Sequence, residues 1–203
     1  GGSSNKSNPV AVVLFQNDYE PFQEYYYFRQ DAHSYYSGLR MNRSSKAEVP
    51  DGNLRSFPTT EIQAPNTPPS IHRLPVDTEV YLLTPHNLPF GLETPVQYKP
   101  IPIPRPARFN RVYSTSSLSV DIDYGMMLEM EVGSSDWPPF IWDHYTSAPE
   151  DPRYKALADD IVSELPIEYQ ELDFAKAVAL KLYLDENMKY TQKVKHDGVP
   201  DPT

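Results

Sequence analysis

The residue types that most often carry catalysis or bind metals are sparse in this sequence. Cysteine is absent, so these residues offer neither a thiolate nucleophile nor a thiolate metal ligand. The five histidines lie far apart, and none sits two or four positions from another; they are His33, His72, His86, His144 and His196. Zinc sites usually place two ligands at such short spacings. The sequence therefore predicts no metal, no cofactor and no enzymatic activity of its own.

Acidic residues form two local groups, and neither predicts a reactive site. Asp121 and Asp123 are two positions apart, but the glycine of a calcium-binding loop is missing. Glu168, Glu171 and Asp173 lie between two predicted helices, where carboxylates cap helix N-termini and improve solubility. The sequence also lacks a nucleophile elbow, a phosphate-binding loop and a dinucleotide-binding fingerprint.

Aromatic residues offer the better candidates for recognition. Tyr25 and Tyr27 alternate in a predicted strand, which places both side chains on one face. Trp137 and Trp142 flank a rigid Pro-Pro-Phe-Ile segment. A sugar ring could stack on these tryptophans, but a core plug or an interdomain cluster is the favoured interpretation. We take these four side chains as a candidate recognition or interdomain surface.

Charge narrows the range of partners. The formal net charge is −10, and residues 136–187 contribute twelve acidic against four basic side chains, a balance of −8. An acidic surface repels phosphate backbones, so we expect no nucleic-acid partner. The longest apolar run, Val10 to Phe15, is far shorter than the roughly 20 residues of a membrane span, so we expect no membrane insertion of these residues.

The sequence predicts a β-rich domain over residues 10–145, preceded by a disordered linker at residues 1–9. The linker begins with Gly1-Gly-Ser-Ser4, which is typical of a cloning remnant. The apolar run Val10–Phe15 predicts a strand buried on both faces. Alternation predicts further strands at Gln23–Arg29, Ser34–Gly38 and Thr78–Leu83, and a hairpin formed by residues 111–124 and 128–132. Short strands with proline-rich connections favour an antiparallel sandwich or open barrel.

Prolines predict extended connections between these strands. Residues 42–75 are polar and rich in proline, which indicates a loop or a wrapped extended segment. Tyr98 to Pro106 carries proline at alternate positions from Pro100 on, and proline lacks the amide donor that a central strand requires. We expect polyproline II or an edge there.

From residue 146 the apolar period changes to that of helices. Asp151 and Pro152 suit a helix start, and a stripe of Tyr154, Leu157, Ile161 and Leu165 runs to Pro166. Asp173 is predicted to cap a second helix. Its apolar stripe consists of Phe174, Ala177, Leu180, Leu184 and Met188, after which the chain leaves the helix toward Tyr190 and Thr191.

This C-terminal stretch resembles the lead-in to the catalytic domain of bacterial transglutaminase-like proteins. The resemblance rests on Tyr145 to Ala158, on the helix from Asp173 that runs into Tyr190-Thr191, and on Pro200 to Thr203. Tyr25 to Arg29 and Tyr35 to Gly38 are similar to the β region that precedes such domains in membrane-anchored members. In that superfamily a glycine-aromatic-Cys motif follows this lead-in.

The resemblance implies an α+β, mainly β fold: an antiparallel sandwich-like module followed, over residues 146–203, by the first helices of an incomplete papain-like domain. The parent would perform acyl transfer or amide hydrolysis with a Cys thiolate, a His base and an Asp. It would lie on the periplasmic or extracellular side of a bacterial membrane. This chain would position or cover the catalytic domain beyond Thr203, or recognise a protein or peptidoglycan substrate. The alternative is a stand-alone module that binds carbohydrate or cell-wall polymer.

Overall fold

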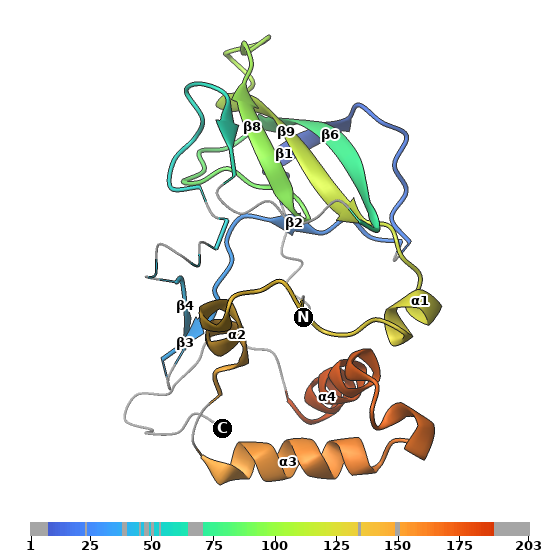
Figure 1. Cartoon of the computed structure of the whole chain (residues 1–203). Helices are drawn as coiled ribbons and strands as arrows, with labels where there is room; N and C mark the ends of the chain where they lie inside the picture. The colour runs from blue at the N-terminus through green and yellow to red at the C-terminus, as the bar shows by residue number, and fades with distance from the viewer. Residues whose placement is uncertain are drawn as a thin grey trace, which may run out of the picture. The chain divides into compact units, whose positions relative to one another are not determined.

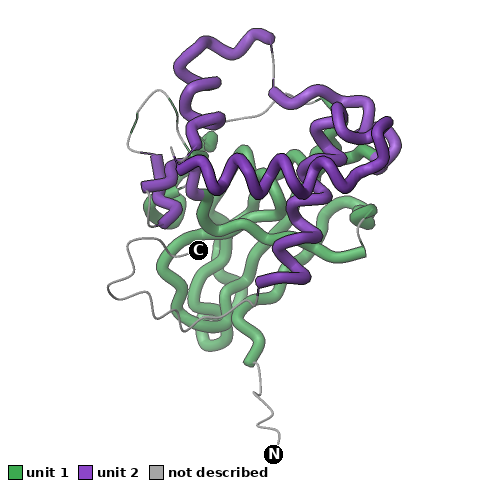
Figure 2. Tube along the Cα trace, turned by 90° about the horizontal axis from the view of Figure 1, so that it is seen from below, with its two compact units in different colours: residues 1–32, 45–122 green, residues 33–44, 123–203 purple. Residues whose placement is uncertain are grey.

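The computed structural model describes residues 8–22, 24–37, 40–44, 46, 49, 51–52, 54–64, 71–133, 135–148 and 151–188. These residues divide into two compact units (Figure 2). Unit 1 comprises residues 1–32 and 45–122, and unit 2 comprises residues 33–44 and 123–203. The division after Ile122 falls earlier in the chain than the predicted domain boundary at residue 145. The predicted linker up to residue 7, the exit at Tyr190-Thr191 and the segment Pro200–Thr203 lie outside the described residues.

Unit 1 is built on a five-stranded antiparallel sheet in the order β1-β6-β9-β8-β5 (Figure 1). Its strands are β1 (Ala11–Phe15), β5 (Ile62–Gln63), β6 (Arg73–Leu82), β8 (Pro95–Pro100) and β9 (Arg111–Val120). A two-stranded ribbon of β2 (Phe28–Arg29) and β7 (Gly91–Leu92) completes the unit. The predicted sandwich therefore has no second sheet of comparable size within the described residues, while the mixed α+β class with more strands than helices is confirmed.

The two long central strands follow directly from sequence alternation. β6 buries Val76, Thr78, Val80 and Leu82 on one face, and β9 pairs with it over ten residues, Arg73↔Val120 to Leu82↔Arg111. Side chains two residues apart share a face of a strand, so this alternation gives one buried and one exposed face. The predicted strand at Thr78–Leu83 and the predicted extension of the hairpin's first strand back to Arg111 are confirmed in β6 and β9.

The second half of the predicted hairpin is wrong. Residues Tyr124–Leu128, at the predicted turn, form the short helix α1, and residues 129–132 after it are irregular rather than a return strand. Asp123 caps this helix, because its carboxylate accepts a hydrogen bond of 2.8 Å from the Met126 amide. The alternation of Leu128, Met130 and Val132 has no sheet to pack on, and Met130 and Val132 are exposed.

β1 is an edge strand, which corrects the prediction that it is buried on both faces. Among the described residues it pairs with β6 alone, from Ala11↔Leu82 to Phe15↔Thr78. Val12 and Leu14 point away from the core and are 36% and 46% exposed. An unbroken apolar run fits an edge strand as well as a central one, so the pattern alone could not separate the two.

Prolines interrupt the sheet less than predicted. β6 begins at Arg73 and contains Pro75, while β5 lies inside the predicted proline-rich connection of residues 42–75. β8 runs to Pro100 between β9 and β5, with a register irregularity between Pro95 and Gln97. The alternating prolines after Ile101 lie outside any strand. The strand predicted over Gln23–Arg29 shrinks to β2, since Glu24 adopts a positive φ of 61° that breaks the extended backbone.

Unit 2 contains the ribbon β3 (Tyr35–Tyr36) and β4 (Met41–Asn42), and the helices α2 (Pro139–Thr146), α3 (Pro152–Ser163) and α4 (Asp173–Asn187). A 3₁₀ turn, η1 (Ile167–Tyr169), joins α3 to α4. The predicted N-cap of α3 is confirmed, because the Asp151 carboxylate accepts from the Arg153 amide at 2.9 Å. No helix within the described residues is long and apolar enough to cross a membrane.

Helix α4 packs a face that only partly coincides with the predicted stripe. It lies against α3 and α1, and its apolar residues Ala175, Ala179, Leu180 and Tyr183 are buried or half-buried. Phe174 and Leu180 of the predicted stripe are half-buried, and the Phe174 ring stacks on that of Tyr124 in α1 at 6.1 Å, whereas Ala177, Leu184 and Met188 are exposed. Asp173 is the first helical residue, since Leu172 occupies the cap position. The Asp173 carboxylate instead accepts from the Val132 amide at 3.3 Å and pairs with Lys176 at 3.4 Å.

Candidate functional site

The four predicted surface aromatics fall into two groups in different compact units. Tyr25 and Tyr27 belong to unit 1 and are 63% and 59% exposed in the segment that leads to β2. Trp137 and Trp142 belong to unit 2. Each group therefore has its own surroundings.

The tyrosine segment is held by its neighbours rather than by a strand. The Tyr26 hydroxyl, between the two predicted residues, donates to the Tyr19 carbonyl at 3.3 Å, and the Tyr26 ring lies 4.8 Å from that of Phe15. The Tyr27 carbonyl accepts from the Glu93 amide at 2.8 Å. Tyr25 and Tyr27 thus project from a backbone that is fixed at Tyr26 and Tyr27.

Glu93 anchors this region from within unit 1. Its carboxylate accepts from the Tyr19 hydroxyl at 2.9 Å and from the Val120 amide at 2.8 Å, and its φ of 41° is unusual for a residue other than glycine. Burial, together with the neighbouring Glu93 carboxylate, raises the pKa of Tyr19 to about 12. Both oxygens of Glu93 are engaged in bonds that hold the fold together, so we assign this carboxylate a structural role.

The tryptophans of unit 2 pack against each other. Their ring centroids lie 5.3 Å apart in an edge-to-face arrangement, and Tyr145 lies 5.9 Å from Trp137. Gly133 closes the cluster at a φ of 82°, where an added Cβ would come within 2.4 Å of the Trp142 ring. This packing fits the favoured interpretation of a packed aromatic cluster better than an open platform for sugars.

A buried histidine that the sequence did not single out lies beside this cluster. His144 of α2 is 5% exposed, and its Nε2 shares a hydrogen bond of 3.0 Å with the Ser34 hydroxyl. The Ser147 hydroxyl donates to the His144 carbonyl at 3.0 Å. The pair connects residues 110 positions apart and links the chain next to the β3–β4 ribbon to α2 within unit 2.

A pocket in unit 1 is lined entirely by described residues. Its volume is about 430 Å³, and its walls are mostly apolar. The residues that line it come from three separate stretches of the chain: Val10, Ala11, Val13, Phe28, Gln30, His86 and Phe90. Ligand sites are commonly apolar hollows of this size with a few polar groups at defined places.

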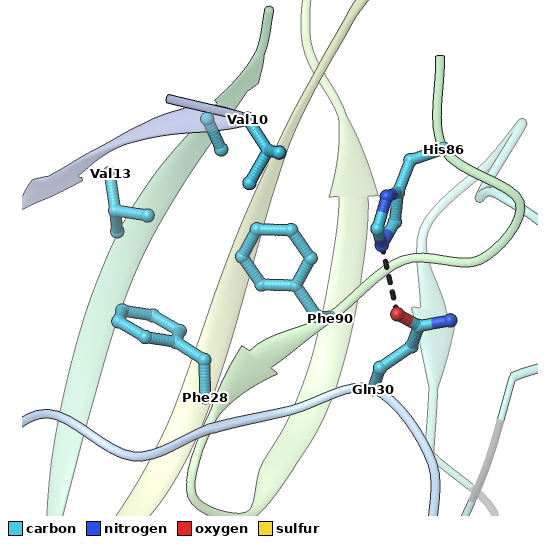
Figure 3. A pocket seen from close by; sticks show the side chains of 7 residues that line it. Val10, Val13, Phe28, Gln30, His86 and Phe90 are labelled. Carbon is cyan, nitrogen blue, oxygen red and sulfur yellow. Dashed lines mark hydrogen bonds between the residues drawn. The ribbon is translucent and has the colours of Figure 1, made fainter. Parts of the chain in front are cut away.

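The polar side of this pocket is formed by His86 and Gln30 (Figure 3). His86 Nε2 lies 2.8 Å from Gln30 Oε1, and the imidazole ring meets the Phe90 ring edge-on at 5.7 Å. Phe90 stands between this pair and the apolar side chains of Phe28 and Val13 (Figure 3). The pocket therefore offers an apolar floor with hydrogen-bonding groups along one side.

Phe90 is fixed from behind by the core. The Tyr113 hydroxyl accepts from the Phe90 amide at 3.0 Å and donates to the Phe90 carbonyl at 2.9 Å. Tyr113 is almost fully buried, and this burial raises the pKa of its hydroxyl well above the usual range. A hydroxyl that stays protonated keeps both bonds, so the pocket wall is preorganised.

An apolar lining with two hydrogen-bonding side chains is an arrangement that suits ligand binding. Within the described residues, no three His, Cys, Asp or Glu side chains come together as a metal site would require. Sequence reasoning missed the pocket because residues near positions 10, 30 and 90 meet only in the folded sheet. The only local signals were the apolar run at Val10–Phe15 and the isolated phenylalanines Phe28 and Phe90.

Comparisons with protein-family models, with curated proteins and with solved structures find no match to this chain.

Proposed function

We propose that this chain is a non-catalytic region of an extracytoplasmic bacterial transglutaminase-like protein, in which it positions or covers the catalytic domain or recognises its substrate. The parent would carry out acyl transfer or amide hydrolysis with a Cys nucleophile that is absent here. The proposal rests on the sequence resemblance and on one structural observation, the second apolar face of α4.

Helix α4 carries apolar residues on two sides. One side packs within unit 2, while Val178, Leu182, Leu184 and Met188 remain exposed on the other. A helix that is apolar around most of its circumference is normally buried within a larger domain. Exposed apolar side chains of this number favour α4 as an inner helix whose second face is covered by further protein. That is the place the resemblance gives it, at the start of a papain-like domain.

The encoding gene offers the first test. We expect the reading frame to continue past Thr203 into a glycine-aromatic-Cys motif. A stop codon near that position would exclude the proposed parent protein.

A paired stability measurement tests the role of α4. In this chain alone, Leu182→Asp changes an exposed side chain, and we expect little change in thermal stability. In the longer protein the same change buries a carboxylate without a partner, so we expect a loss of several kcal/mol. Glu186→Asp, an exposed change on the same helix that adds no charge, is the matched control. Equal, small effects of Leu182→Asp in both proteins would argue against the proposal.

The exposure of Tyr25 and Tyr27 favours a second candidate, a stand-alone module that binds carbohydrate or cell-wall polymer. Exposed aromatic rings are suitable stacking surfaces for sugars. A peptidoglycan pull-down compares this chain with a variant lacking both tyrosine rings and with one lacking Trp137 and Trp142. Binding that depends on either pair supports this candidate, and absent or unchanged binding removes it.

A further inference from the structure

We propose that unit 1 binds an extended peptide, which adds as a strand to the open edge of β1 and inserts one apolar side chain into the adjacent pocket. The inference uses the pocket and the edge of unit 1 alone. It therefore stands or falls separately from the transglutaminase-like proposal, which rests on α4.

The open edge of β1 presents regularly spaced backbone donors and acceptors. Leu83 donates to the Val10 carbonyl at 2.9 Å, and Gln16 donates to the Asp77 carbonyl at 2.9 Å. Because ladder bonds alternate along an antiparallel pair, residues 10, 12, 14 and 16 face β6. The amides and carbonyls of Ala11, Val13 and Phe15 therefore point to the other side, where no strand pairs with β1 among the described residues.

This edge lacks the usual protection against strand addition. Exposed edges are commonly blocked by proline, by charged side chains or by a bulge. Residues Ala11–Phe15 include no proline and no charge, and their register with β6 is regular over all five residues. The strand can therefore accept a further strand through its backbone.

The pocket lies on the face of the sheet toward which every second side chain of an added strand would point. Ala11 and Val13, whose backbone groups point to the open edge, also line the pocket (Figure 3). Alternate side chains of an added strand fall on this face. Main-chain bonds then supply affinity and the pocket selects one side chain, which is a recurring mode of peptide recognition.

The lining determines the chemistry of the anchor. No lining residue is acidic, and none is Lys or Arg, so a charged side chain would lose its hydration without gaining a partner. A leucine or phenylalanine side chain fits a pocket of about 430 Å³ with Phe28, Phe90 and Val13 in its walls. The His86–Gln30 pair adds hydrogen-bonding groups at the side of the pocket.

Acidic side chains near one end of β1 indicate which end of the peptide carries a basic residue. Asp18, Glu20 and Asp77 are exposed near the C-terminal end of β1. An antiparallel peptide places its N-terminal half at that end, as every pair in the sheet is antiparallel. We therefore expect a basic residue on the N-terminal side of the apolar anchor.

The experiment uses N-acetylated, C-amidated heptapeptides of threonine and serine that begin with lysine and differ only at the central residue. Isothermal titration with the whole chain measures binding of the Leu, Phe, Gly and Asp versions. We expect the Leu or Phe peptide to bind at least tenfold more tightly than the Gly and Asp peptides. We also expect replacement of the initial lysine by glutamate to weaken binding. Equal affinities, or no binding of any peptide, would overturn the inference.

Two variants separate the edge from the pocket. Val13→Pro removes an amide that does not bond to β6, and proline is tolerated on such an edge. Ala11→Phe fills the pocket. Each variant should lower the affinity for the Leu peptide at least tenfold. Val12→Thr changes a side chain that points away from the pocket and should leave this affinity unchanged. Unchanged binding in both variants contradicts the inference.

Circular dichroism verifies that each variant is folded. If Ala11→Phe does not fold, His86→Ala replaces it as the test of the pocket lining, and we expect His86→Ala to bind the Leu peptide more weakly. A second copy of the chain is the competing occupant of this edge. Self-association that Val13→Pro abolishes, without peptide binding, would assign the edge to a dimer and refute the peptide proposal.

Discussion

The sheet of unit 1 and helix α4 of unit 2 differ in how completely their apolar side chains are buried. Along β6, the apolar residues Val76, Val80 and Leu82 all point to one face, and all three are almost fully buried. Along α4, apolar residues point in both directions, and Leu182 and Leu184 are about half exposed. From Val76 to Leu82 the first element has one apolar face that is fully packed, while the second element has packed only one of its two apolar sides.

This difference shows which conclusions each region can support. A strand with one apolar face needs one layer of cover, and unit 1 supplies it from its own residues. A helix with two apolar faces needs cover on both sides, and unit 2 supplies one. A binding function of unit 1 would therefore use the pocket beside its packed core. The function of unit 2 would depend on the protein that covers the second face of α4.

A pair of leucine truncations gives the largest expected contrast. Leu82→Ala should lower the free energy of unfolding by about 2–5 kcal/mol, because Leu82 is 1% exposed and its removal leaves a cavity. Leu182→Ala, at 52% exposure, should cost less than about 0.5 kcal/mol. Urea denaturation followed by far-UV circular dichroism measures both. Similar losses in the two variants would break the comparison between the regions.

Alkaline pH should weaken the core of unit 1 next. Burial raises the pKa of Tyr98 to about 12, above the ordinary value of 10.0. The folded state therefore favours the neutral phenol, and this contribution is complete below pH 10 and is lost as the pH rises toward 12. Two pKa units correspond to about 3 kcal/mol. Denaturation at pH 9 and pH 11.5 measures the effect, and Tyr98→Phe should flatten the dependence; an equally steep dependence in that variant would exclude Tyr98 as a cause.

A glycine substitution tests the packed part of unit 2. Gly133→Ala should destabilise the tryptophan cluster by about 1–3 kcal/mol, because the new methyl group meets the Trp142 ring at a positive φ. Trp137 and Trp142 are the chain's two tryptophans, so tryptophan fluorescence reports on unit 2. Gly125→Ala is the matched control, with its nearest atom at 3.2 Å and no positive φ. A larger effect at Gly125 than at Gly133 would contradict the described packing.

The smallest expected effect is at the start of α3. Hydrogen bonds from Arg153 lower the pKa of Asp151 from 3.8 to about 2. The ionised cap therefore stabilises the helix above about pH 4, and this contribution is lost as the pH falls toward 2. Asp151→Ala should speed amide hydrogen exchange in the first turn of α3 at pH 6, while α4 stays unchanged. Unaltered exchange at Arg153 and Tyr154 would show that the cap contributes little.

Much of the secondary structure follows from local patterns, and its errors have physical causes. β6 and β9 were predictable because one face of each is buried, and α3 was predictable because its cap lies next to its helix. The stripe of α4 was only partly right, because apolar residues occur on both sides of the helix and the period alone does not select the packed face. The strand predicted at residues 128–132 failed because Asp123 starts a helix just before it.

The candidate sites were less predictable than the fold. The sequence gives no sign that His86, Gln30 and Phe90 approach β1, because these contacts form only once β6 and β7 are in place. The aromatic pairs were visible as residues, but their roles depend on surroundings: Gly133 beneath the tryptophans and Glu93 behind the tyrosine segment. Long-range contacts of this kind leave no local period to read.

The hydrogen bond between Ser34 and His144 also bears on how the chain is made. The β3–β4 ribbon leaves the ribosome with the early strands, but its partner helix is 110 residues away. At a synthesis rate of about 5–20 residues per second, the ribbon emerges roughly 5–20 s before α2. During that interval Ser34 has no histidine to meet, so the early part of unit 2 must wait while most of unit 1 is synthesised. Unit 2 can therefore be completed only late in synthesis, after α2 has left the ribosome.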